Sequence, residues 1–140
     1  MPPLAGETVV APGDFPATFA AACSGNVALT TTEVDITGAT VTFSTVKANA
    51  KYLVIASFYM SSVVGGTAVA AGKLNVDGSN QPAFANYTGV STNERANVAQ
   101  SWSGTLAAAG SHTLKLRGVL SAGTGVTVNA THTTINVLVL

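Results

Sequence analysis

Charge is the scarcest feature of this 140-residue chain. Six basic and six acidic residues make up only 9% of the sequence and cancel to a net charge of zero. Soluble domains usually carry roughly 25% charged residues. The six Lys and Arg are spread from Lys47 to Arg117 without a cluster, so the chain lacks the basic surface that phosphate backbones require. We therefore expect no nucleic-acid partner. Either something other than charge keeps this surface in solution, or a partner covers much of it.

Cysteine and long hydrophobic runs are also missing. Cys23 is the only cysteine, so it cannot form a disulfide within the chain, and no second ligand stands at zinc spacing from it. No window reaches the ~18 consecutive apolar residues of a membrane-spanning helix. The stretch before Cys23 lacks the basic start and the unbroken apolar run of a secretion signal. We expect neither membrane contact nor a cleaved leader.

Catalytic and cofactor motifs are absent from the sequence. It contains no phosphate-binding loop, no dinucleotide glycine motif and no Gly-Xaa-Ser-Xaa-Gly elbow. Glu33 and Asp35 would share one face of a strand, but calcium needs six to eight oxygens, so we expect a solvated pair. His112 and His132 lack metal-ligand neighbours along their strands; copies could meet at a threefold axis, but a structural role is favoured. We predict that the protein is not an enzyme and holds no cofactor or metal.

Proline is confined to one end of the chain. Four of the five prolines fall within residues 1–25, and only Pro82 lies beyond them. Because proline fixes φ and removes a backbone donor, this segment predicts an extended arm, with one short helical turn over residues 17–22. The arm carries apolar side chains that a solvated tail would not need, and we expect these to dock onto a partner: Leu4, Val9, Val10, Phe15 and Phe19.

Short β-strands separated by turn residues dominate the rest of the sequence, residues 26–140. Leu114 and Leu116 would point to one side of a strand while Lys115 and Arg117 point to the other, as in a half-buried antiparallel strand. The pattern predicts an all-β, antiparallel two-sheet sandwich. The expected strands are 27–31, 33–37, 40–46, 51–61, 72–77, 83–88, 95–107, 112–120 and 125–139.

Two segments, 52–60 and 135–140, are apolar on both faces of their expected strands. Such strands must be covered on both faces. The second sheet covers one face, and either the arm or a neighbouring subunit covers the other. We expect an interface between subunits at Tyr52, Phe58, Tyr59, Trp102, Leu138 and Leu140.

Four segments of the chain together resemble a known family. They are KYLVIAS at 51–57, LNVDG at 74–78, AAGSHTLKLR at 108–117 and TTINVL at 133–138. Their succession resembles the tumour-necrosis-factor-like jelly roll shared with complement globular heads, and in particular its versions in tailed-phage virion proteins. The resemblance implies a jelly roll that forms a homotrimer. The opening LAGETVVA and the following Asp14-Phe15-Pro16 are similar to leaders of actinobacterial phage structural proteins.

The resemblance and the apolar arm together suggest a phage capsid decoration, or cement, protein. A homotrimer would attach to the major capsid protein through its arms, on the outer face of the virion shell, after synthesis in the host bacterial cytoplasm. The alternative is a tail or fibre component with a receptor-binding jelly roll. It would need an exposed aromatic cluster, for which Tyr59, Tyr87 and Trp102 are the candidates. A secreted cytokine-like ligand or a hydrolase fits the sequence less well.

Overall fold

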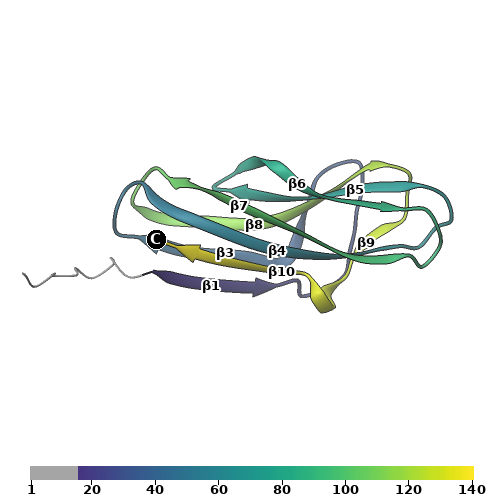
Figure 1. Cartoon of the computed structure of the whole chain (residues 1–140), viewed down its shortest axis with the longest axis horizontal. Coiled ribbons are helices and arrows are strands. Elements are labelled where there is room, and N and C mark those ends of the chain that lie inside the picture. Colours follow the sequence, from purple (N-terminus) through teal and green to yellow (C-terminus); the bar gives the residue numbers. More distant parts are fainter. Residues whose placement is uncertain (1–15) are drawn as a thin grey trace, which may run out of the picture.

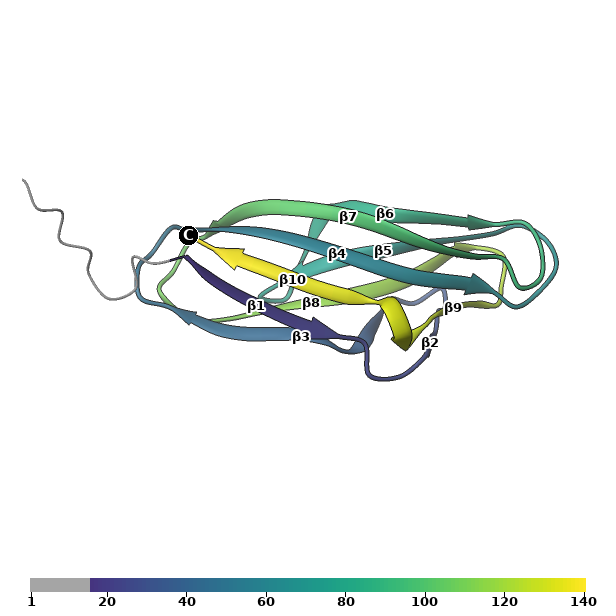
Figure 2. The same ribbon diagram turned by 60° about the horizontal axis from the view of Figure 1, so that its bottom comes forward.

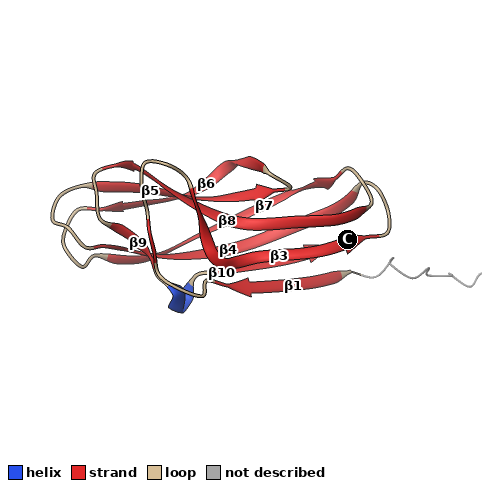
Figure 3. Cartoon of the chain, turned by 180° about the vertical axis from the view of Figure 1, so that it is seen from behind, coloured by secondary structure: helices blue, strands red, loops and turns tan. Residues whose placement is uncertain are grey.

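The computed structural model describes residues 16–140. These residues form two antiparallel β-sheets packed face to face (Figure 1). The predicted arm residues Leu4, Val9, Val10 and Phe15 lie outside the described residues. Strands account for nearly all regular structure between residues 16 and 140, where a single 3₁₀ turn interrupts them (Figure 3). No helix between residues 16 and 140 is long and apolar enough to cross a membrane. The prediction of an all-β two-sheet sandwich is confirmed.

Each sheet contains strands that are distant in the sequence. Sheet A has the order β1-β10-β4, with β7 on the other side of β4; the short β9 pairs with the end of β4, and β2 pairs with β9. Sheet B has the order β3-β8-β5-β6. Sheet A comprises β1 (Ala17–Ala22), β2 (Val27–Ala28), β4 (Ala50–Ser62), β7 (Arg95–Leu106), β9 (Val126–Val128) and β10 (Thr134–Val139). Sheet B comprises β3 (Val34–Thr45), β5 (Ala68–Val76), β6 (Ser79–Gly89) and β8 (Gly110–Ala122).

The core lies between the sheets and follows the alternation of the sequence. On β8, Leu114 and Leu116 are completely buried, whereas Lys115 and Arg117 point away from the core. On β4, Val54, Phe58 and Met60 fill the interior in the same way. Burying such side chains contributes about 1.5–3 kcal/mol each. On β8 the inward residues are set by the alternation of apolar and polar residues, whereas β4 is apolar on both faces and only its burial alternates.

Two of the expected strand boundaries are wrong. Residues 33–37 and 40–46 belong to one strand, β3, which changes register between Asp35 and Thr40. Gly38 permits this irregularity: its φ is +85°, and a Cβ there would lie 2.7 Å from the Ala22 carbonyl oxygen. The expected strand 125–139 is instead two strands, β9 and β10, separated by the 3₁₀ turn η1 (Ala130–His132).

The segment 17–22 forms a strand and not the helical turn expected from the sequence. β1 pairs with β10 along its whole length, from Ala17 opposite Val139 to Ala22 opposite Thr134 (Figure 2). Every second side chain of β1 faces sheet B, and the ring of Phe19 stacks on Phe43 at a centroid distance of 4.8 Å. Phe19 is therefore a part of the sandwich and not a free docking residue.

Three of the expected interface residues are also interior. Tyr52, Phe58 and Trp102 are no more than 5% exposed, because their positions on β4 and β7 face sheet B. The Trp102 indole nitrogen donates a hydrogen bond to the Ala83 carbonyl oxygen at 2.8 Å. The chain itself covers these side chains, which corrects their assignment to a subunit interface. Of the other three, Tyr59 and Leu138 are half-buried and Leu140 is exposed, all on the outer side of sheet A.

Candidate functional site

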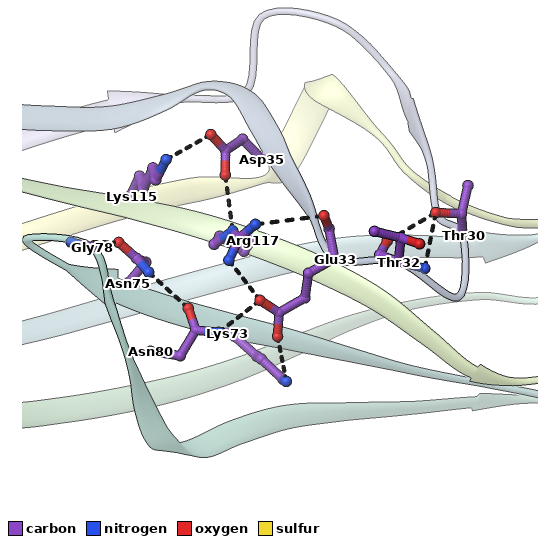
Figure 4. A network of polar contacts seen from close by, with 10 residues as sticks. All are labelled: Thr30, Thr32, Glu33, Asp35, Lys73, Asn75, Gly78, Asn80, Lys115 and Arg117. Carbon is purple, nitrogen blue, oxygen red and sulfur yellow. Dashed lines mark hydrogen bonds and ion pairs between the residues drawn. The ribbon is translucent and has the colours of Figure 1, made fainter.

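The outer face of sheet B, the one turned away from sheet A, carries a network of charged side chains (Figure 4). Strand pairing sets Asp35, Arg117 and Lys73 in one row across β3, β8 and β5. Arg117 lies between two carboxylates, with its Nε 2.9 Å from Asp35 and its Nη1 2.6 Å from Glu33. Lys115 pairs with Asp35 at 2.7 Å, and Lys73 pairs with Glu33. The network satisfies its own charges almost completely.

Both carboxylates of this network are held in the ionised form. The hydrogen bond from Lys73 is the largest cause and lowers the pKa of Glu33. Burial opposes it, but the hydrogen bond from Asn80 and the charges of Lys73 and Arg117 also lower this pKa. The hydrogen bond from Lys115 lowers the pKa of Asp35 in the same way. Glu33 and Asp35 are thus ion-paired, where the sequence suggested only solvation. The described residues contain no group of three or more His, Cys, Asp or Glu that could hold a metal ion.

The outer face of sheet A is chemically the opposite. Its centre carries large apolar side chains beside small ones, and charged residues occur only towards its ends, at Lys51 and Arg95. Leu53 is 36% exposed and Ile55 is 54% exposed. The outward side chains at the centre of this face are Thr18, Ala20 and Ala22 on β1, Thr134, Asn136 and Leu138 on β10, Leu53, Ile55 and Ser57 on β4, and Ala99, Ser101 and Ser103 on β7.

A shallow groove of about 340 Å³ runs over this face. Leu53, Ile55 and Leu138 line it together with Asn136 and Ala20. In the strand register Leu53 lies opposite Leu138, and Ile55 lies opposite Asn136. This arrangement is the second apolar face that the sequence pattern of 52–60 and 135–140 required, and nothing between residues 16 and 140 covers it.

A second polar cluster surrounds His112 near one end of the sandwich. The ring is buried; its Nδ1 lies 2.7 Å from Asp77, and its Nε2 lies 3.0 Å from the Ala108 carbonyl oxygen. Burial by itself would raise the pKa of Asp77, but its hydrogen bonds with His112 and the Thr113 backbone N–H lower it. The cluster connects the β5–β6 turn and the β7–β8 turn to β8. His112 therefore has structural contacts, as the sequence favoured.

The aromatic residues considered for receptor binding do not form a surface cluster. Tyr87 and Trp102 are buried, and the Tyr87 hydroxyl donates to the Glu94 carbonyl oxygen at 3.0 Å. Tyr59 is the partly exposed one, and its ring meets His132 edge-on at a centroid distance of 5.4 Å. Of the three candidates, only Tyr59 on β4 keeps a partly exposed ring contact, with His132 of the turn η1.

Sequence reasoning missed the residues at the centre of the sheet A face. Leu53 and Ile55 alternate with Tyr52 and Val54, so either set could have faced the core. Asn136 gave no signal because a lone polar residue in an apolar strand is ordinarily a solvent-facing one. The segment 52–60 is apolar on both faces, and this pattern located the strand. It did not show which of the two sets of side chains faces the core.

The strand order and the two packed antiparallel sheets define a jelly-roll sandwich. No family model matches the chain, and no curated protein matches it in sequence. Among solved structures it is similar to the Eiger TNF of S. frugiperda, with a TM-score of 0.53 and 12% identity over 88% of this chain and 92% of that chain. This likeness agrees with the predicted TNF-like fold.

Two viral structures also share the fold. The T13 particle of IBDV matches with a TM-score of 0.59 and 11% identity over 99% of this chain and 35% of that chain. The VP2 subviral particle of infectious bursal disease virus matches with a TM-score of 0.54 and 11% identity over 90% of this chain and 33% of that chain. The chain thus spans about a third of the length of these viral proteins, and the likeness concerns the fold alone.

Proposed function

We propose that the chain is a non-enzymatic virion protein, a phage capsid decoration protein that works as a homotrimer. The observation that carries this proposal is the contrast between the two outer faces. The face of sheet A exposes Leu53 and Ile55 without central charge, whereas the face of sheet B carries the Glu33–Arg117 network. A subunit with one apolar and one charged face is suited to associate through the first and meet water with the second. The jelly-roll likeness to viral particle proteins supports a place in a virion.

The sheet A face has the chemistry of a subunit interface. Covering Leu53, Ile55 and Leu138 would contribute about 1.5–3 kcal/mol for each fully buried side chain. Stable interfaces bury about 800 Å² on each partner, so contacts must extend beyond these three side chains to their neighbours on β1, β10, β4 and β7. Tyr59, Leu138 and Leu140 remain in this proposed interface from the sequence prediction, and Leu53 and Ile55 join them.

Residues 1–15 are proposed to attach the trimer to the outer capsid surface. Ala17 pairs with Val139, so the chain enters the sandwich beside its C-terminus (Figures 1 and 2). A rotationally symmetric trimer would place three such N-terminal segments at one end. Each N-terminal segment carries Leu4, Val9, Val10 and Phe15 as contacts for the major capsid protein. Three weak contacts on one particle act together, because the second and third become intramolecular.

Deletion of residues 1–15 tests the attachment. The deletion ends before β1, so it leaves the sheet intact. The shortened protein should keep the oligomeric state of the full chain in analytical ultracentrifugation but lose co-sedimentation with shells of the cognate phage. The full chain is the control for shell binding. Equal co-sedimentation of both proteins would show that residues 1–15 do not attach the protein to the shell.

A tail or fibre component that binds a host receptor is the alternative. The partly exposed Tyr59–His132 ring pair is the feature that supports it. The number of copies per virion separates the two functions, since a decoration protein is present in many copies and a fibre in few. Quantitative mass spectrometry of purified virions against the major capsid protein gives that ratio.

A further inference from the structure

Asn136 occupies the centre of the sheet A face. It lies on β10, opposite Ala20 on β1 and opposite Ile55 on β4, and Ser101 on β7 completes the row. Its side chain lines the shallow groove together with Leu53 and Leu138 from the adjacent row. An amide thus stands where the face is otherwise apolar or small.

The Asn136 amide has no partner within residues 16–140. The side chain is exposed, and it makes no hydrogen bond to any described residue. Elsewhere between residues 16 and 140 every buried polar side-chain atom is satisfied. If another molecule covers the face, the amide loses its water, and leaving it unpaired would cost about 1–3 kcal/mol. The covering surface must therefore supply both a donor and an acceptor at this point.

A second copy of the same chain meets that requirement. An asparagine side chain has a carbonyl acceptor and an NH₂ donor, so it can hydrogen-bond to a copy of itself. The centre of the face carries no charge that would select a charged partner, and Ala20 and Ala22 leave room for close approach. A single polar residue within an apolar interface is known to fix register and subunit number at some cost in stability.

We propose that Asn136 lies at the rotation axis of the homotrimer, where three side-chain amides form a closed ring. Each NH₂ group donates to the carbonyl oxygen of the next subunit. The ring satisfies the three amides and selects the arrangement in which they coincide. This inference rests on the proposed association through sheet A. It identifies Asn136 as the residue that sets the geometry of that association.

Substitution by aspartate tests the axial position. Three carboxylates brought together at an axis repel one another, so Asn136→Asp should weaken association by about 100-fold or more at neutral pH. Association should return as the pH falls below about 4, where the carboxyl groups become protonated. Asn86→Asp makes the same change at an exposed position on the outer face of sheet B and should leave association unaltered. Sedimentation velocity measures the association, and circular dichroism verifies that each variant is folded.

Cross-linking gives a second measurement that does not depend on destabilisation. With Asn136→Cys, mild oxidation by copper phenanthroline should join two of the three subunits of each trimer by a disulfide. Asn86→Cys should give no cross-link under the same conditions, and the native Cys23 is buried.

The outcomes separate this inference from the proposed function. A trimeric wild-type protein whose Asn136→Asp variant stays trimeric, with no cross-link from Asn136→Cys, would overturn the axial position and leave the trimer standing. A wild-type protein that is monomeric at every concentration would overturn both.

Discussion

Glu33 shows how one residue depends on neighbours from separate strands. It directly precedes β3 and contacts Arg117 on β8, Lys73 on β5 and Asn80 on β6 (Figure 4). These partners lie 40 to 84 positions away in the sequence. The sequence showed two acidic residues with a spacing of two and several scattered basic ones. Only the folded sheet brings these acidic and basic residues together.

The lowered pKa of Glu33 predicts a pH-dependent contribution to stability. A carboxylate whose folded pKa lies below its ordinary value of 4.5 stabilises the fold above that value, and the contribution is lost as the pH falls through the folded pKa. Glu33→Gln should therefore lower the free energy of unfolding by about 1 kcal/mol at pH 7, because these pairs are partly exposed. The deficit should disappear under more acidic conditions.

Urea denaturation of both proteins between pH 7 and pH 2 measures this difference. Because stability is compared at each pH, changes shared by the two proteins cancel. A deficit that is constant over the whole range would show that Glu33 does not act through its charge.

At the scale of single elements, β1 is the largest departure from the sequence prediction. Its alanines and the nearby prolines suggested an arm with a helical turn, yet it is an edge strand paired with β10. Local propensity could not decide this, because the partner strand lies more than a hundred residues away. The 3₁₀ turn between β9 and β10 was missed for a related reason. There the buried Thr133 hydroxyl accepts from the Tyr59 N–H and donates to the Asn129 carbonyl oxygen, contacts that exist only after folding.

The packing of β1 predicts that Phe19 contributes to the stability of the sandwich. Phe19→Ala removes the stack on Phe43 and should destabilise the chain by about 2–3 kcal/mol, less than a fully buried phenylalanine would, because Phe19 is only half-buried. Phe84→Ala on β6 is the matched control, because that ring is 49% exposed on sheet B. It should cost much less.

Guanidinium denaturation of the two variants and the wild type gives these free energies. Equal and small effects at both positions would mean that β1 is not anchored through Phe19.

At the scale of the whole molecule, the two outer faces decide how the subunit is used. The sheet A face is uncharged at its centre and exposes large apolar side chains, and the sheet B face carries the charge network. The few charged residues of the chain are therefore unevenly distributed over its surface. Charge is concentrated on one face and absent from the centre of the other.

The proposed interface predicts a clear effect of one substitution. Ile55 is 54% exposed, so Ile55→Lys should be tolerated by the single subunit, but association would bury three ammonium groups. We expect the variant to be folded and monomeric in sedimentation velocity. Ser44→Lys, at an exposed position on the outer face of sheet B, should keep the wild-type oligomeric state. An Ile55→Lys trimer of normal stability would place the interface elsewhere.

The sequence by itself determined the fold class, most strand positions and the need for cover on both faces of 52–60 and 135–140. These follow from the period-two alternation and the turn residues, which are local properties of the chain. The tertiary structure decided which apolar set faces inwards, placing Tyr52, Phe58 and Trp102 in the core and Leu53 and Ile55 outside. When both faces of a strand are apolar, hydrophobicity cannot choose between them, and the choice falls to packing against the opposite sheet.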